Sequence, residues 1–476
     1  MRLKRWILGL SASLCVSVAM AQPPITEPLF TDAPWPTWGY DMRRSHYVPD
    51  VAGPNTPAVR WFRVGGALEE PAMPSPDSLW VPQHPSTGSR YTRYSFYNAS
   101  NGRLTGSFGP FWGQPSTPIF LNAAIFIVDS NGNPVFPPVP WNALMLSGGQ
   151  YESLLFSPSP VFGIPDVFWT IRGFPAYRTG FGAFTDGFYI YPIFADNFGN
   201  IIILYLAWFI EVDSSGNITY VIADYGYIPF DQIPAASLST VSGAGNLVLL
   251  GFHNGLLLAL DTTVFDYAWF TNIATLSDNG SGPEVASDAF DRPIAITSDE
   301  QTAIVCASNS GRVYGVAMAD GSRQWEYQAG KAIMGGPSIG PDPNNSNEDT
   351  VYIVVRHSAT QSAIHAIRAA DGAQKWVRLL PNVSRCTPTI DQNGVLYIGD
   401  ERGFFYAINP NSTLKWQIYL GAPIRVAPVL ADVGGVATLF VAASNRYLYA
   451  IVDQSALSTG ITPGGVVRTP GGAIPR

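Results

Sequence analysis

Residues 303–325 read AIVCASNSGRVYGVAMADGSRQW, and three later stretches repeat their pattern of apolar runs, turn formers and a closing Trp. Residues 395–416 (VLYIGDERGFFYAINPNSTLKW) align with them from their apolar start through Gly311 and Gly403, and residues 351–376 (VYIVVRHSATQSAIHAIRAADGAQKW) form a third copy. A fourth copy at 439–453 (LFVAASNRYLYAIVD) stops before its Trp. The last third of the chain is therefore built from repeated units.

The spacing of the closing Trp residues indicates the kind of unit. Trp325, Trp376 and Trp416 follow one another after 51 and 40 residues. A period near ~45 residues is typical of a propeller blade of four strands. Each unit also divides into apolar strands separated by turn formers, such as Asp320-Gly321 and Asp371-Gly372 before the Trp strand. The repeat predicts an all-β propeller of four-stranded blades.

Short segments with a Pro precede the units, namely Gly336-Pro337, Thr387-Pro388 and Ala427-Pro428. We interpret them as the innermost strands. The Pro lies among the first residues of each strand, where a backbone N–H group is least needed for pairing with the next strand. A large Trp on the outermost strand then fills the wedge between diverging blades. The alternative for these Trp side chains is an aromatic cage for a cationic ligand.

The pattern continues toward the N-terminus in weaker form. Residues 246–269 end in Trp269, residues 94–106 carry no Trp, and Trp61 stands alone. Because the final unit lacks its Trp strand, we expect the strand of Trp61 to complete it and close the ring. Units of ~45 residues then give about eight blades, with seven as the alternative. The repeat does not assign blades to residues 115–232. Two blades with long insertions and three irregular blades are the alternatives for this region.

Composition agrees with this fold class. Charged residues make up 13% of the 476 residues, with 46 Gly, 40 Pro and 22 Tyr. Such a mixture suits short strands and tight turns and disfavours helical bundles. The net charge of −8 without a basic tract argues against nucleic acid as a partner.

The N-terminus has the features of a secretory signal. Arg2, Lys4 and Arg5 precede an apolar run to Met20, and Ala19-Met20-Ala21 fits a cleavage site. That run is ~15 residues, short of the ~20 of a spanning helix, although a membrane anchor is the alternative. Lipidation at Cys15 is a further alternative, which Leu14 before it disfavours.

These features define an expected organisation. We expect a signal peptide at 1–21, a lead-in segment at 22–57, the propeller at 58–453 and a disordered tail at 454–476. Removing the signal changes the net charge to −11. The mature protein is expected to be a periplasmic or extracellular monomer without a membrane span.

The repeats resemble those of quinoprotein-type propellers, which carry pyrroloquinoline quinone (PQQ)-like repeats. The resemblance lies in GRVYGV at 311–316, GFFYAI at 403–408, the Asp-Gly-x-x-x-Trp stretches at 320–325 and 371–376, and the lead-in WPTWGYDMRRS at 35–45, which Gly53-Pro54 follows. It is good over 285–453, fair over 35–106 and 240–270, and poor over 115–232. It implies the propeller fold but several functions, among them dehydrogenases, outer-membrane assembly factors and binding proteins.

The dehydrogenase branch makes demands that this sequence does not meet. Enzymes of that branch typically stack a disulfide of adjacent cysteines on PQQ, whereas Cys306 and Cys386 lie far apart in this chain. Each aligns with an apolar repeat position, which favours a buried small hydrophobe over a reactive group. No motif places a Ca²⁺ site or a catalytic base. We therefore predict no catalytic residue, cofactor or metal, with PQQ and Ca²⁺ as the alternative.

One set of residues is a candidate ligand site. Arg385 and Arg425 each lie three residues before the Pro of an innermost strand, Arg292 is close to the matching position, and Lys331 is nearby. Such positions tend to face the mouth of the central channel, where a basic rim suits a carboxylate or an acidic peptide. Ordinary solvated charge is the alternative.

Three functions follow from these observations. The first is an exported binding or scaffolding propeller without catalytic activity, whose partner is a protein or a small acidic ligand. The second is a PQQ-dependent oxidoreductase. The third is a surface protein that binds polysaccharide through its aromatic residues.

Overall fold

The computed structural model describes residues 39–457, except Met42, 66–69, 84–90, 113–118, 132–138, 148–151, 157–168, 173–182, 186–189, 196–199, 216–217, 235–237, Thr262, Phe265, 273–289 and Asp291. At residues 74, 91–92, 108–127, 139–210 and 218–241 the description is restricted to the backbone. The predicted signal peptide, Cys15 and most of the predicted tail lie outside the described residues.

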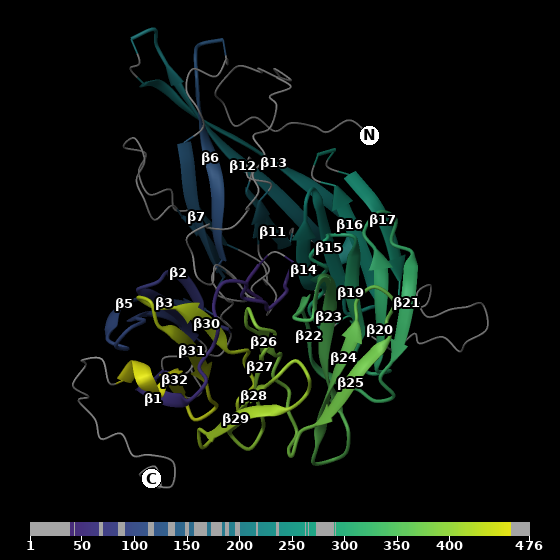
Figure 1. Ribbon diagram of the computed structural model, residues 1–476. Coiled ribbons are helices and arrows are strands. Elements are labelled where there is room, and N and C mark those ends of the chain that lie inside the picture. The colour runs from purple at the N-terminus through teal and green to yellow at the C-terminus, as the bar shows by residue number, and fades with distance from the viewer. Residues whose placement is uncertain are drawn as a thin grey trace.

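Six four-stranded antiparallel sheets make up most of the described chain, arranged around a common centre (Figure 1). From the inner to the outer strand, the first four are β2 (Ala72–Ser75), β3 (Ser78–Gln83), β4 (Tyr91–Asn98), β5 (Leu104–Trp112); β14 (Leu238–Ala244), β15 (Leu247–Phe252), β16 (Leu256–Asp261), β17 (Asp266–Asn272); β18 (Ala295–Ile296), β19 (Thr302–Ala307), β20 (Arg312–Ala317), β21 (Arg323–Gln328); and β22 (Ile333–Asp342), β23 (Asn345–Arg356), β24 (Ser362–Arg368), β25 (Gln374–Leu379).

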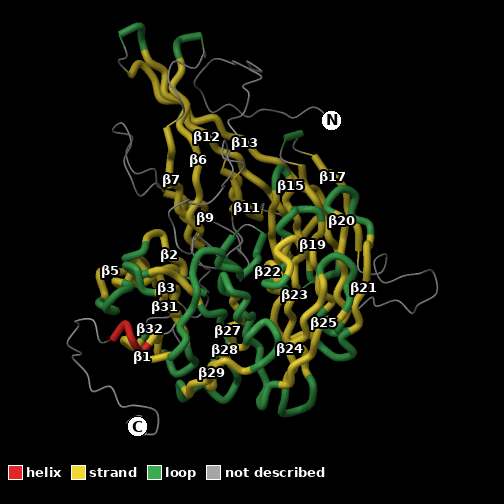
Figure 2. The backbone as a smooth tube through the Cα atoms, in the orientation of Figure 1, coloured by secondary structure: helices red, strands yellow, loops and turns green. Residues whose placement is uncertain are grey.

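The other two are β26 (Thr389–Ile390), β27 (Leu396–Gly399), β28 (Phe404–Ile408), β29 (Leu414–Tyr419); and β30 (Val429–Asp432), β31 (Ala437–Ala442), β32 (Tyr447–Asp453), β1 (Pro57–Val64). Strands dominate the backbone trace, and a short 3₁₀ helix, η2 (Gln454–Leu457), follows β32 (Figure 2). The prediction of an all-β propeller is confirmed. Two of the Pro residues lie just ahead of innermost strands, as expected: Pro388 before β26 and Pro428 before β30. Pro337 instead lies within β22, at a register irregularity.

The last sheet closes through the N-terminal strand, as predicted. β1 pairs antiparallel with β32, and Trp61 stands opposite Ala450. Because β32 and β1 come from opposite ends of the chain, no hairpin turn joins them. The Asp453 carboxylate fills this gap: it accepts hydrogen bonds from the backbone N–H groups of Asn55 and Thr56 at 2.9 and 3.0 Å, and from the Thr56 hydroxyl at 2.9 Å. The backbone donor of Thr56 is the main reason that the pKa of Asp453 lies far below its usual range.

Each closing Trp links its own sheet to the next. The indole N–H donates to a backbone carbonyl of the following sheet. Four acceptors lie in the turn before the outermost strand, in the pairs Trp269–Met318, Trp325–Ala369, Trp376–Pro410 and Trp61–Ala99, and the fifth, Pro54 for Trp416, lies just before β1. Within its own sheet each Trp stands opposite a small residue of the third strand: Ala259, Gly315, Ala366, Ala407 and Ala450. The repeat therefore places an aromatic ring between neighbouring sheets.

The turn that receives the indole must also be small. Gly372 adopts a φ of +73°, and an added Cβ there would lie 2.6 Å from Cε3 of Trp325. Gly321 stands in the same relation to Trp269, at a φ of +73° and 2.5 Å. The Asp-Gly pairs of the repeat thus combine a left-handed turn with close approach of the ring.

Hydroxyl groups link the sheets at their inner ends. Ser338 of β22 donates to the carbonyl of Pro388 at 2.6 Å, Thr389 of β26 donates to that of Pro428, and Ser242 of β14 donates to that of Ile294. The innermost strands also lie beside one another: β14 contacts β18, β18 contacts β22, and β22 contacts β26. Inner hydroxyls and outer indoles together tie the blades into a ring.

Residues 119–234 depart from the four-stranded pattern. They form one eight-stranded sheet: β6 (Ile119–Val128), β7 (Val139–Ser147), β8 (Glu152–Phe156), β9 (Trp169–Arg172), β10 (Ala183–Thr185), β11 (Ile190–Ala195), β12 (Asn200–Val212) and β13 (Ile218–Pro234). Because this sheet does not divide into two or three separate blades, the count of eight or seven blades stays a prediction.

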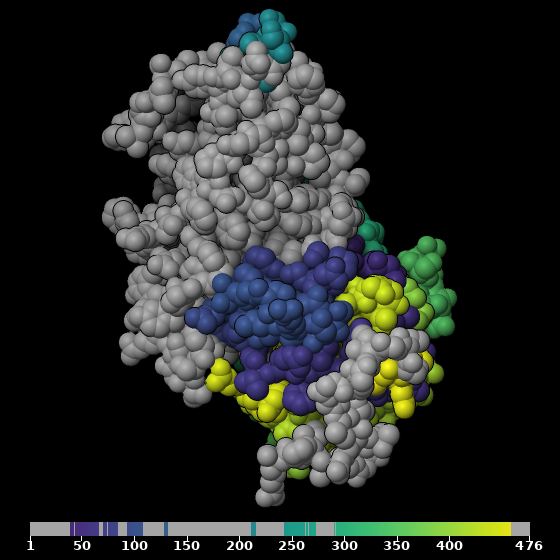
Figure 3. All heavy atoms as spheres, turned by 90° about the vertical axis from the view of Figure 1, so that its left-hand side faces the viewer, coloured from purple at the N-terminus to yellow at the C-terminus, as the bar shows by residue number. Residues whose placement is uncertain are grey.

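Two hairpins of this large sheet extend beyond the other sheets (Figure 1). β6 runs parallel to β12, with Val128 beside Glu211, so both hairpin tips point the same way. The tips share a sequence, VDSNGN at 128–133 and VDSSGN at 212–217. In each, the Asp accepts a hydrogen bond from the backbone two residues on, at 2.8 Å. The described tip residues lie side by side in Figure 3.

No helix among the described residues meets the length and hydropathy needed to cross a membrane. The domain limits at 22–57, 58–453 and 454–476 stay predictions.

Candidate functional site

The lead-in segment lines the inner ends of three sheets. The backbone N–H groups of Ile296, Ile339 and Ile390 donate to the carbonyls of Arg43, Ser45 and His46 at 2.8–2.9 Å. Tyr47 forms a parallel bridge with Ile390. Innermost strands otherwise present these backbone groups to the channel, so segment 43–51 satisfies donors that the fold leaves open.

Backbone strain is concentrated in this segment. Tyr40, Arg44 and His46 adopt left-handed φ values of 74°, 58° and 54°. Residues other than Gly seldom hold this conformation without support, and strained positions cluster at functional sites. The contacts of the lead-in with the innermost strands and with Glu70 supply that support.

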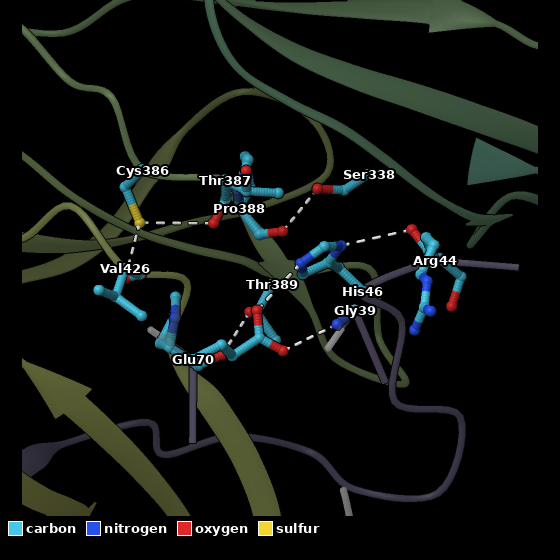
Figure 4. A network of polar contacts seen from close by, with 12 residues as sticks. Gly39, Arg44, His46, Glu70, Ser338, Cys386, Thr387, Pro388, Thr389 and Val426 are labelled. Carbon is cyan, nitrogen blue, oxygen red and sulfur yellow. Dashed lines mark hydrogen bonds and ion pairs between the residues drawn. The ribbon is translucent and has the colours of Figure 1, made fainter. Parts of the chain in front are cut away.

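A buried polar cluster joins the lead-in to the connection between β1 and β2 (Figure 4). The Glu70 carboxylate accepts a hydrogen bond from the Gly39 backbone N–H at 2.8 Å and contacts Nε2 of His46 at 3.3 Å, and both side chains are fully buried. Nδ1 of His46 faces the carbonyl of Arg44 at 3.3 Å. The imidazole of His46 is therefore held between the carboxylate of Glu70 and the backbone carbonyl of Arg44.

Arg44 is the largest fully buried side chain of this cluster. Burial lowers the pKa of its guanidinium to about 10, against the opposing effect of Asp41 and Glu70, so it is a cation at neutral pH. Asp41 in turn pairs with Arg43 at 3.1 Å and accepts from the hydroxyl and backbone N–H of Ser45. The charges are balanced inside the cluster, which fits a structural role.

The same cluster tests whether PQQ and Ca²⁺ fit this chain. Cys386 lies near it, but its thiol is buried, contacts the carbonyls of Thr387 and Val426 at 3.4 Å, and has a pKa raised by burial to about 12. Cys306 is buried in β19. Both oxygens of Glu70 are engaged by the lead-in, and no group of three His, Cys, Asp or Glu side chains in the described ranges is placed to bind a cation. These residues do not fit a stacked quinone with its cation.

Two of the predicted rim residues come together. Glu401, in the turn between β27 and β28, pairs with Arg425 at 2.7 Å and with Arg385 at 3.4 Å. The side chains of Arg385 and Arg425 are 50% and 57% exposed, whereas that of Glu401 is 19% exposed. Arg385 precedes β26 and Arg425 precedes β30, so one carboxylate bridges the connections to two neighbouring innermost strands.

The other two rim residues lie elsewhere. The ammonium of Lys331 donates to the carbonyl of His357 at 2.6 Å, and Arg292 is half-buried just before β18. Neither contacts Glu401 in the part of the chain that the structure describes. The predicted rim is thus reduced to a pair, and whether it binds a ligand stays a prediction.

Sequence reasoning missed Glu401 and the lead-in cluster. Glu401 had a detectable signal, because the repeat places Asn309 at the same position of its turn, between Ser308 and Gly311. Of these two aligned turns, the one in residues 395–416 has an acidic residue at this position and the other has Asn309. The cluster had no such signal, since Glu70, Arg44 and His46 meet through tertiary contacts alone.

Comparison with known proteins agrees with the fold. A family model described as outer membrane protein assembly factor BamB matches residues 309–455. Quinohemoprotein alcohol dehydrogenase from Comamonas testosteroni is similar in structure, with 10% identity, a TM-score of 0.55, and coverage of 89% of this chain and 81% of that one. BamB from Moraxella catarrhalis has 13% identity, a TM-score of 0.49, and coverage of 83% and 97%.

No curated protein sequence matches the chain. The strand order, the Trp links and the family match over the C-terminal repeats nevertheless agree with one another. This chain is a β-propeller protein with PQQ-like repeats.

Proposed function

We propose that this chain is an exported binding or scaffolding propeller that catalyses no reaction of its own. The observation that carries the proposal is the state of the central polar residues. Glu70 and His46 are buried and paired with each other, and Arg44 is buried close to them. The lead-in occupies backbone donors of the innermost strands. Polar groups committed in this way hold the ring together and leave binding to the exposed surface.

The exposed rim pair is the surface that we assign to binding. Arg385 and Arg425 are half-exposed cations on a chain of net charge −8, so they attract acidic groups that the rest of the surface repels. The partner is a protein or a small acidic ligand. The family match to an outer membrane assembly factor and the signal-like N-terminus support a location in the periplasm or outside the cell.

A PQQ-dependent oxidoreductase is the second candidate, because the similarity to the dehydrogenase structure spans 89% of this chain. That similarity concerns the fold, and the buried thiols and Glu70 argue against the chemistry.

One experiment separates the two candidates. Purified protein is mixed with PQQ and Ca²⁺, and absorption spectra and reduction of an artificial electron acceptor are recorded. A binding propeller yields neither a cofactor band nor dye reduction. Saturable, Ca²⁺-dependent dye reduction would refute the proposal, and retention of the protein on an insoluble glycan would favour the polysaccharide alternative.

Partner capture tests the binding role directly. A photo-crosslinking residue at Arg402, beside Glu401, is compared with one at Asn411, in the outer turn between β28 and β29. We expect a defined adduct from position 402 and none from position 411. Equal labelling at both positions would contradict binding at the rim.

A further inference from the structure

The backbone that carries Glu401 is held by hydrogen bonds within its turn. Asp400, next to Glu401, is fully buried and accepts hydrogen bonds from the backbone N–H groups of Arg402 and Phe404 and from the hydroxyl of Tyr406 at 2.7–2.9 Å. The Glu401 N–H donates to the carbonyl of Val383 at 2.8 Å. The turn therefore fixes where the backbone of Glu401 lies.

The two arginines are also held at a set separation by their backbones. Cys386, directly after Arg385, contacts the carbonyl of Val426, directly after Arg425, through its sulfur at 3.4 Å. This contact brings the two connections side by side (Figure 4). Two guanidinium groups from different sheets thus converge on one point at the surface.

The charges at this point do not balance. Arg425 uses Nε and one terminal nitrogen on Glu401, at 2.7–3.0 Å, and Arg385 contacts it through Nε at 3.4 Å. Two cations share one carboxylate, which leaves one positive charge on an acidic protein and guanidinium nitrogens facing solvent. A planar fork of donors is suited to a carboxylate of the partner.

We propose that Glu401 is an internal substitute for a ligand carboxylate. In this view Arg385 and Arg425 form a clamp for an acidic segment of a partner protein, and Glu401 occupies the clamp until such a carboxylate displaces it. The inference rests on the proposed binding function and names the chemistry of the partner. Exposed ion pairs are weak, so displacement costs little. Glu401 would then discriminate against weakly acidic competitors while it keeps the arginines in place.

The test measures binding of a fluorescein-labelled oligoglutamate peptide to the full protein by fluorescence anisotropy at low ionic strength. Glu401→Gln removes the internal competitor and keeps the shape of the side chain, so we expect about two- to fivefold tighter binding than in the wild type. Arg385→Gln with Arg425→Gln should abolish binding. Added salt should weaken binding in the wild type and in Glu401→Gln, because the contacts are exposed.

A matched control is available in the neighbouring sheet. Arg368 is 44% exposed and pairs with Glu348 and Asp371, so Arg368→Gln removes a comparable paired arginine away from the clamp. It should leave peptide affinity unchanged, and an oligoglutamine peptide should not bind. Thermal unfolding of every variant checks that the fold is kept.

The outcomes separate this inference from the proposed function. Equal affinity of wild type and Glu401→Gln, or binding that survives loss of both arginines, overturns the clamp even if a partner is captured elsewhere. Succinate that competes as tightly as the peptide overturns the assignment to an acidic segment in favour of a small acid. Dye reduction with PQQ would refute the proposed function without altering the peptide result.

Discussion

The contact between Trp325 and Gly372 supports a quantitative prediction about how the blades hold together. The indole of Trp325 is buried, donates to the Ala369 carbonyl at 2.7 Å, and covers the turn that contains Gly372. A Cβ at residue 372 would lie 2.6 Å from the ring, closer than such atoms approach in folded proteins. Gly372→Ala therefore strains both the backbone and the interface between two sheets.

The expected cost has two parts. A residue with a Cβ in the left-handed region costs roughly 1–2 kcal/mol. Forcing an additional methyl into a packed interface costs typically about 1–3 kcal/mol more. We expect Gly372→Ala to lower the free energy of unfolding by about 2–5 kcal/mol.

Gly330 provides the matched control. Its φ is +79°, close to that of Gly372, and no atom lies within 4 Å of where its Cβ would be. Gly330→Ala should show the backbone part alone, about 1–2 kcal/mol. Urea unfolding of both variants gives the difference, which measures the steric part.

A double-mutant cycle assigns that difference to the ring. In a Trp325→Leu background the obstructing atoms are gone, so Gly372→Ala should cost about as much as Gly330→Ala, with a coupling free energy of about 1–3 kcal/mol. Equal costs of Gly372→Ala in both backgrounds would refute the idea that the indole sets the size limit at this turn.

Four further outcomes follow from the structure. Removing residues through Trp61 deletes most of β1 and should lower the thermal unfolding temperature of the whole described ring; an unchanged temperature would show that closure does not need this strand. Glu70→Gln breaks a buried pair and should cost about 3–5 kcal/mol in urea unfolding, against less than about 1 kcal/mol for the exposed-pair control Glu326→Gln. Burial, with a smaller effect of His357, lowers the pKa of His365 to about 4, so between pH 6.5 and 4 the unfolded chain binds more protons than the folded one; stability should fall over that range on acidification, and His365→Gln should flatten the profile. The Cys386 thiol should be inert to a disulfide reagent at pH 8 until the protein is unfolded, since burial raises its pKa to about 12; rapid labelling of the folded protein would contradict its buried position.

Much of the fold could be predicted from local patterns in the sequence. The alternation of apolar strands and a turn before a Trp recurs in three units, with Asp-Gly in two of these turns, and predicted four-stranded sheets where the structure has them. Closure through Trp61 was also predictable, because the final unit lacks its last strand and an isolated strand with a Trp stands near the N-terminus. Both inferences depend on a repeat, which carries information about neighbours in space.

The region of 115–232 was not predictable in the same way. Its strands pair across long distances, as when β6 aligns in parallel with β12 some eighty residues later. Pairing of this kind leaves no short-range period. The shared tip sequence VDSNGN and VDSSGN was a local signal for the two hairpins, but their alignment in one sheet required the backbone.

The sequence by itself determined the scaffold, because strand alternation, turn residues and the spacing of Trp are local properties that repeat. Tertiary structure decided which side chains meet at the candidate sites. Glu70 meets His46 across 24 residues, and Glu401 meets Arg425 across 24 residues from a different sheet. Such contacts form only when the closed ring brings the loops of separate blades together. Burial and charge balance then favour the pairs that the structure shows.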